Sequence, residues 1–133
     1  MRGERAARKG DDEVSALILL TTANALLYLA AALFHSGAPL PFTVFQPSPP
    51  ASIAEGLIGV VLAVAAAMLV RAPSTRFAWG AYVFALAGTL LGLSIILAAR
   101  IGGPDLWVHF VMLAGLAVGF ALLAGARGRT RSI

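Results

Sequence analysis

Four apolar stretches, each about twenty residues long and uncharged in its central part, constrain this chain more than any other feature. They cover residues 14–35, 51–70, 77–99 and 105–124. A helix rises about 1.5 Å per residue, so about 20 residues cross a hydrocarbon core about 30 Å thick. Because lipid offers the backbone no hydrogen-bond partner, each stretch must pair its peptide groups internally. The pattern predicts an all-α membrane protein with four transmembrane helices.

The composition excludes a water-soluble domain. Of the 133 residues, 59% are hydrophobic and only 12% are charged, and a chain this short has too little interior to hide so much apolar surface. The sequence has no cysteine, which excludes disulfides, thiolate metal sites and cysteine nucleophiles. We therefore expect the lipid bilayer to be the principal partner of this chain.

Three short connections separate the four stretches. The first, residues 37–50, holds five prolines and no charge, while residues 71–76 and 102–104 form tighter links. Short links make consecutive helices antiparallel neighbours, so we predict one antiparallel four-helix bundle over residues 14–125, with tails at 1–13 and 126–133. The apolar side chains of the first connection are expected either to anchor at the membrane interface or to close over the bundle as a lid: Phe42, Val44 and Phe45.

The distribution of lysine and arginine predicts the orientation. Nine of the ten cations lie in the two tails or in residues 71–76, and only Arg100 lies on the opposite side. Since short cytoplasmic segments carry the excess of positive charge, both termini are predicted to be cytoplasmic. We expect a multi-pass protein of a bacterial cytoplasmic (inner) membrane, and we expect the arginines to meet anionic headgroups and not nucleic acid.

Polar residues in the first stretch share one face. Thr21, Asn24, Tyr28 and His35 follow helical spacing, with Ala31 between them. Exposure of polar groups to lipid is costly, so this stripe is predicted to face the bundle interior. The alternative for Asn24 is a purely structural hydrogen bond to a neighbouring helix. Asn24 and Tyr28 also favour a retained span over a cleaved signal peptide, whose apolar region is usually shorter.

Glu55 is the strongest functional candidate in the second stretch. It begins a row of small residues, Gly59, Ala63 and Ala67, at steps of four, which indicates that the carboxylate points toward protein. An ionised group so placed needs a partner. The alternative is a glutamate that reaches headgroup water from the first turn and forms a capping box with Ser52.

The fourth stretch opens with Asp105 and His109, four residues apart on one face. In the predicted topology these residues lie at the outer end of the bundle, together with His35 and Glu55. We predict a site for a cation, a proton or a small ligand there, against the alternative of ordinary interfacial polar residues. The candidate residues for this site are Glu55, His35, His109, Asp105, Asn24 and Tyr28.

Cofactor and catalytic signals are weak. Glu55, His35 and His109 are ligand types that suit a divalent metal, and the two histidines meet the minimum requirement for a haem b, but no local spacing ties them together, so no cofactor is predicted. The chain lacks a phosphate-binding loop, a GxSxG elbow and a dinucleotide-binding fingerprint, and no catalytic residue is assigned. An enzyme is the less favoured interpretation.

Two glycine pairs indicate close helix contacts: Gly88 with Gly92, and Gly115 with Gly119. These faces could join helices within one chain, bind a membrane-protein partner, or form a homo-oligomer. The size of the chain favours a non-catalytic accessory or structural subunit of a membrane complex. The alternative is a transport or binding protein that uses the polar site at the outer end.

Overall fold

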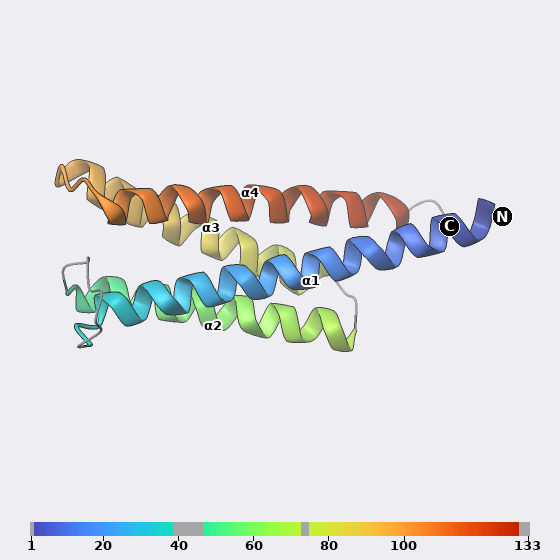
Figure 1. Cartoon of the computed structure of the whole chain (residues 1–133), viewed down its shortest axis with the longest axis horizontal. Helices are drawn as coiled ribbons and strands as arrows, with labels where there is room; N and C mark the ends of the chain where they lie inside the picture. The colour runs from blue at the N-terminus through green and yellow to red at the C-terminus, as the bar shows by residue number, and fades with distance from the viewer. Residues whose placement is uncertain (1, 39–46, 73–74, 131–133) are drawn as a thin grey trace.

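The computed structural model describes residues 2–38, 47–72 and 75–130, with side chains described from residue 11 to residue 126 of these ranges. This part of the chain contains four helices and no strand (Figure 1): α1 (Arg2–His35), α2 (Pro49–Arg71), α3 (Thr75–Ala98) and α4 (Pro104–Thr130). Each helix is long and apolar enough to cross a membrane. In this part of the chain, the prediction of an all-α protein with four helices that are able to span a membrane is confirmed.

Helices α1 and α4 extend furthest beyond the predicted spans. The predicted N-terminal tail is helical from Arg2, and the segment of α1 that is apolar enough to span begins at Asp11. At the other end of the sequence, α4 continues to Thr130, six residues past the predicted limit. Arginine, alanine and glutamate are good helix formers, so a helix can continue into water after its apolar segment ends. The first connection ends earlier than the predicted limit of residue 50, because Pro49 and Pro50 belong to the first turn of α2. The first turn of a helix tolerates proline, since its backbone amides need no partner within the helix. Phe42, Val44 and Phe45 lie outside the described residues.

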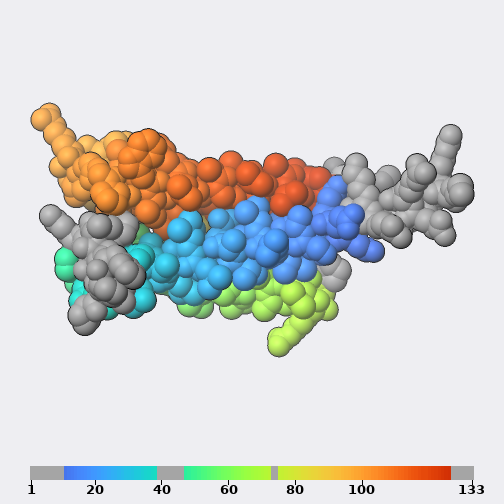
Figure 2. All heavy atoms as spheres, in the orientation of Figure 1, coloured from blue at the N-terminus to red at the C-terminus, as the bar shows by residue number. Residues whose placement is uncertain are grey.

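The four helices run side by side with alternating direction (Figure 1). α1 contacts α2 and α4, and α3 contacts the same two helices, so α1 and α3 face each other diagonally across the centre. The space-filling view shows α1 and α4 pressed together along one face, with α2 along its edge (Figure 2). We call the end where α1 and α3 finish and α2 and α4 begin the histidine end.

Buried and exposed apolar residues divide as expected for a protein in lipid. The core contains leucines from three helices, such as Leu17, Leu62 and Leu116, each no more than 1% exposed. The outer surface carries large apolar side chains on every helix, among them Leu19 and Ile53, which are more than 70% exposed. A soluble monomer rarely exposes continuous apolar surface of this kind. The chain is a multi-pass membrane protein.

The predicted polar stripe of α1 lies in the interior. Thr21, Asn24, Tyr28, Ala31 and His35 are each less than 5% exposed, which confirms the prediction that this face points into the protein. Thr21, Asn24 and Tyr28 bond to α3, the diagonal helix, and His35 bonds to α2. The stripe therefore positions polar side chains along the whole centre of the domain.

Two tyrosine–threonine pairs cross the diagonal between α1 and α3. Tyr28 is hydrogen-bonded to Thr89, and the Tyr82 hydroxyl lies 3.1 Å from the Thr21 hydroxyl. Each threonine uses its single proton on the carbonyl four residues earlier, at 2.7 Å in both cases. Each tyrosine must therefore be the donor to its threonine. The two pairs fix the register of two helices whose backbones are not in contact.

The glycine pairs accommodate side chains of the same chain. A Cβ on Gly88 would lie 2.5 Å from Ile58 Cδ1, and one on Gly92 would lie 2.7 Å from His109 Nε2. A Cβ on Gly115 would collide with Asn24, and one on Gly119 with the Tyr82 ring. These glycines are thus occupied by contacts within the chain. Association with a membrane-protein partner or a second copy through these faces stays a prediction.

Candidate functional site

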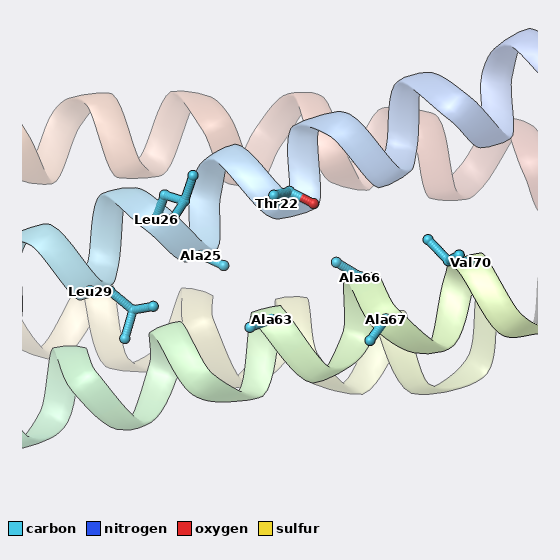
Figure 3. Close-up of a pocket in the computed structure, with 8 residues that line it drawn as sticks. All are labelled: Thr22, Ala25, Leu26, Leu29, Ala63, Ala66, Ala67 and Val70. Atoms are coloured by element: carbon cyan, nitrogen blue, oxygen red, sulfur yellow. The ribbon is translucent and has the colours of Figure 1, made fainter.

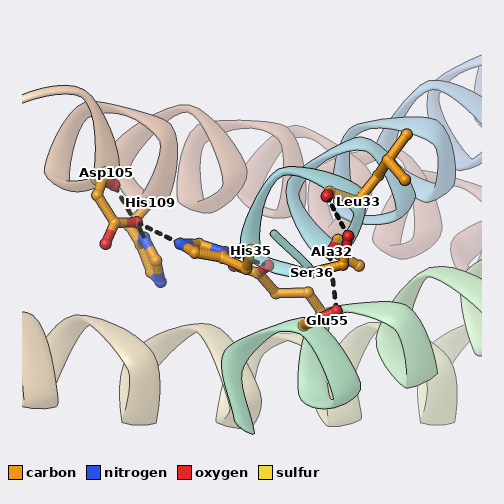
Figure 4. A network of polar contacts seen from close by, with 8 residues as sticks. Ala32, Leu33, His35, Ser36, Glu55, Asp105 and His109 are labelled. Carbon is orange, nitrogen blue, oxygen red and sulfur yellow. Dashed lines mark hydrogen bonds and ion pairs between the residues drawn. The ribbon is translucent and has the colours of Figure 1, made fainter. Parts of the chain in front are cut away.

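A histidine–glutamate pair joins the last residue of α1 to the beginning of α2. The Nδ1 atom of His35 lies 2.7 Å from Oε2 of Glu55, so the two side chains share a hydrogen bond (Figure 4). Both residues are buried, at 4% and 7% exposure. The alternative of a glutamate that reaches headgroup water is wrong for Glu55, because its carboxylate turns inward to the imidazole of the neighbouring helix.

Asp105 and His109 bring α4 to the same place. Nδ1 of His109 lies 2.9 Å from the backbone oxygen of Asp105, which can only accept, so this nitrogen carries a proton. Oδ1 of Asp105 lies 3.4 Å from His109 Nδ1 and 3.8 Å from His35 Nε2. The four side chains thus form one row, Glu55–His35–Asp105–His109, with contributions from three helices (Figure 4). We call it the polar row.

The backbone around the polar row is held by contacts between α1 and α2. Ser52 Oγ donates to the Ala32 carbonyl at 2.8 Å, and the Ser48 amide donates to the His35 carbonyl at 2.9 Å. The predicted capping box between Ser52 and Glu55 is wrong: Ser48 is the N-cap of α2, and the Ser52 hydroxyl is used on α1. These bonds position Glu55 beside the end of α1.

A cavity of about 920 Å³ adjoins the polar row. All four members of the row line it, and so do the Tyr28–Thr89 pair and two glycines of α3, Gly88 and Gly92. Most of the remaining wall is apolar: Pro47, Pro50, Ala51, Ala54, Ile58, Leu91, Ile95, Ile96, Ile101, Pro104 and Met112. A concave, largely apolar wall with a few convergent polar groups is the usual form of a small-molecule site.

One acceptor in the site has no donor. Oδ1 of Asp105 is buried and accepts no hydrogen bond from the part of the chain that the structure describes. Its contacts with the two imidazoles are longer than a hydrogen bond or unsuitably directed, because His109 Nδ1 already donates to the backbone. Buried polar atoms almost always have a partner, so this atom marks an incomplete site.

The six predicted site residues divide into two groups. His35, Glu55, Asp105, His109 and Tyr28 come together at the cavity. Asn24 does not line the cavity; it lies nearer the middle of the domain, where its amide donates to the Tyr82 hydroxyl at 3.5 Å. This contact agrees with the structural alternative for Asn24.

Sequence reasoning missed Thr89 and Tyr82, the diagonal partners of Tyr28 and Thr21. A signal was present: Tyr82 and Thr89 are seven residues apart, as are Thr21 and Tyr28. Equal spacing on two helices that run in the same direction places each tyrosine level with a threonine.

A second hollow lies between α1 and α2 on the outer surface (Figure 3). It has a volume of about 300 Å³ and contains no ionisable group. Its one polar residue, Thr22, donates to the Ile18 carbonyl of its own helix at 2.9 Å. The other lining residues are small or apolar: Ala25, Leu26, Leu29, Ala63, Ala66, Ala67 and Val70. The lining of the groove is therefore apolar, apart from a threonine whose hydroxyl is used on its own helix.

The structure also corrects the prediction that the row of small residues after Glu55 faces protein along its whole length. Gly59 is buried, and a Cβ there would meet Leu29 Cγ at 2.7 Å, so the first step of the row packs as expected. Ala63 and Ala67 are instead exposed along the groove. A repeat of four residues drifts around the helix, so only its first part faces α1 closely.

Metal and haem binding gain no support from the geometry. Within the described ranges, no three histidine, cysteine, aspartate or glutamate residues are grouped so that they could hold a metal ion. His35 bonds directly to Glu55 through Nδ1, and we do not assign the polar row as metal ligands. A divalent metal at Glu55, His35 and His109, or a haem b, stays a prediction.

Comparison with family models, with curated proteins and with solved structures gave no match to this chain.

Proposed function

We propose that this protein binds a small amphipathic molecule in the cavity at the histidine end, with the polar group of the molecule at the polar row. The observation that supports this most strongly is the convergence of four ionisable side chains from three helices on one cavity. Ordinary interfacial residues turn outward to headgroups and water. Here His35, Glu55 and His109 turn inward and are less than 8% exposed.

The proposed topology places this site on the outer side of a bacterial inner membrane. The chain is an antiparallel four-helix bundle with both termini in the cytoplasm, because nine of ten cations lie in the two tails or between α2 and α3. The polar row is then reached from the outer leaflet or from outside the cell. A reporter fused after Ala126 and one inserted after Gly102 test this orientation, since only the first should be active as a cytoplasmic reporter.

Native mass spectrometry of the purified protein tests the proposed function. The protein is extracted from its own membrane in mild detergent, and a bound small molecule is expected as a mass shift that disappears on denaturation. Ala54→Trp places a large side chain in the cavity wall and is expected to abolish the shift. Ala63→Trp places the same side chain in the groove between α1 and α2 and should keep the bound molecule, so it serves as the matched control.

The accessory-subunit alternative makes the opposite prediction. It expects a stoichiometric membrane-protein partner in the native extract and no bound small molecule. Finding that partner, together with equal spectra for the wild type, Ala54→Trp and Ala63→Trp, would overturn the proposal. Far-UV circular dichroism of each variant shows whether the fold is retained.

A further inference from the structure

We infer that the ligand of this cavity is a long-chain amphiphile of the membrane, which enters sideways from the lipid between α2 and α3. The inference rests on the proposed function and names the class of its ligand and the route by which it arrives. It combines three observations: the exposure of the cavity walls, their depth along the helices, and the division of polar and apolar groups between the two depths.

The walls of the cavity differ in exposure. Tyr28 of α1 and Met112 of α4 line it and are each only 1% exposed, so they form its back wall. On the side of α2 and α3, several residues line the cavity and are exposed at the same time: Ala54, Leu91 and Ile95. Leu91 is 63% exposed and Ile95 is 59% exposed. We therefore place an opening of the cavity between α2 and α3.

This opening lies at the depth of lipid chains. The helix α3 ends at Ala98, and at about 1.5 Å per residue Leu91 lies about 10 Å before that end. A hydrocarbon core is about 30 Å thick, so a side chain at this depth meets acyl chains and not water. The other exposed lining residues belong to the links and first helical turns at the histidine end: Pro47, Pro50, Ile101, Gly102 and Pro104. The opening thus connects the cavity with the interior of the leaflet at the histidine end.

Polar and apolar groups are divided by depth along the cavity. The polar row lies at the helix ends, as His35 shows, which is the last residue of α1. About 10 Å deeper the wall is formed chiefly by apolar side chains, among them Ile58 and Met112. The polar pair at that depth is already bonded, since Tyr28 donates to Thr89 and Thr89 donates to a carbonyl of its own helix. The cavity is therefore polar at headgroup level and apolar at chain level, which is the order of a lipid leaflet.

This order selects the class of ligand. A molecule with a hydrogen-bonding head and a long apolar chain keeps in the cavity the orientation that it has in the membrane, with its head at the polar row. Its chain covers the apolar depth of the cavity, whose volume is about 920 Å³, and continues through the opening into lipid. A small hydrophilic solute has no group that could cover the apolar wall, so it would leave polar groups against hydrocarbon.

Photolabelling of the full chain in lipid vesicles tests the inference. The probe is hexadecanol with a diazirine at mid-chain, and it is compared with butanol that carries the same diazirine, at equal total concentration. Labelled residues are identified by mass spectrometry of peptic peptides. We expect hexadecanol to label the back wall, Tyr28 and Met112, and butanol to label neither, because its short chain partitions weakly into the membrane. Leu116, which is fully buried on α4 and outside the lining, should stay unlabelled by both probes.

Two double variants locate the route. Leu91→Trp combined with Ile95→Trp places two large rings at the opening and is expected to abolish the labelling of the back wall by hexadecanol. Leu90→Trp combined with Leu97→Trp is the matched control and should keep this labelling, because both leucines are exposed on α3, at 49% and 57%, and neither lines the cavity. If the first variant loses helical circular dichroism, Ile95→Trp alone takes its place.

The outcomes separate the inference from the proposed function. If hexadecanol labels exposed side chains only, or if the variant at the opening is labelled like the wild type, the route through lipid is wrong. If butanol labels the back wall at least as strongly as hexadecanol, the cavity is a ligand site reached from water, so the inference fails and the proposed function stands. If neither probe labels the back wall and no small molecule co-purifies, the proposed function fails as well.

Discussion

The centre of the domain and its histidine end both bury polar side chains, but they complete their hydrogen bonds differently. In the centre, each tyrosine donates to a threonine, and each threonine donates to a backbone carbonyl of its own helix. Both series therefore end within the protein. At the histidine end, Oδ1 of Asp105 accepts no hydrogen bond from the described residues and lies beside a cavity.

This difference distinguishes buried polar groups that stabilise the fold from buried polar groups that can bind a ligand. A completed hydrogen-bond series contributes to register and stability, since any change leaves a buried group unpaired. A series that leaves an acceptor unpaired contributes less to the stability of the fold, and the unpaired acceptor can accept a hydrogen bond from another molecule. Substitutions in the centre should therefore alter stability most, and substitutions at the histidine end should alter ligand binding most.

The largest effect on stability is expected where α4 meets the central tyrosine. Gly119→Ala would put a methyl group into the space of the Tyr82 ring, so α4 must move outward. We expect the free energy of unfolding to fall by about 3 kcal/mol. Reversible unfolding in mixed micelles with increasing SDS, followed by circular dichroism, measures this change.

Gly80→Ala is the matched control for this substitution. Gly80 is exposed in α3, and no heavy atom lies within 4 Å of a Cβ built there. Alanine also restricts the unfolded chain, so we expect unchanged stability or a gain of up to about 1 kcal/mol. Equal losses in both variants would show that Gly119 has no special contact with Tyr82.

A smaller loss in the free energy of unfolding is expected when a tyrosine hydroxyl in the centre of the domain is removed. Tyr82→Phe removes the hydroxyl that donates to Thr21 and accepts from Asn24, and we expect a loss of about 1.5 kcal/mol. Tyr28→Phe should cost about 0.5 kcal/mol, because Thr89 keeps its bond to the Ala85 carbonyl. The same SDS titration measures both values, and a larger loss for Tyr28→Phe would contradict the proposed donor directions.

The backbone at the end of α3 gives a third prediction. At the end of α3 the amides of Arg100 and Ile101 bond back to the carbonyls of Leu97 and Ile96, at 3.1 and 3.0 Å. Arg100 adopts a left-handed conformation with φ 53°, a position that favours glycine. Arg100→Gly should raise the free energy of unfolding by about 1 kcal/mol. Ala99→Gly, one residue earlier, should bring no gain, and a gain there would remove the conformational explanation.

The smallest effect on stability is expected from Asp105→Asn. Oδ1 of Asp105 makes no hydrogen bond that the variant could lose, so we expect a change of less than about 0.5 kcal/mol in the free energy of unfolding. A loss as large as that of Tyr82→Phe would show that the row is structural. The same SDS titration measures this change.

The sequence alone determined the class of protein and the number of helices that can span a membrane. Apolar length and charge placement report directly on the solvent around a helix, and neither depends on which helices are neighbours. The inward stripe of α1 was also readable, because Thr21, Asn24 and Tyr28 lie at helical spacing on a single helix. The helix ends were less readable, as the extension of α1 to Arg2 shows, since helix propensity continues past the apolar segment.

Only the tertiary structure decided which buried polar groups have hydrogen-bond partners and which do not. The sequence could place His35, Glu55, Asp105 and His109 at one end, but not the 2.7 Å contact between His35 and Glu55 or the unused oxygen of Asp105. Nor could the sequence show that the Ser52 hydroxyl bonds to α1, or that Tyr82 pairs with Thr21. These contacts join helices far apart in the chain, and their geometry depends on the rotation and depth of each helix to within about 1 Å. Spacing along one helix fixes a face, whereas a hydrogen bond between helices is fixed only when all four have packed.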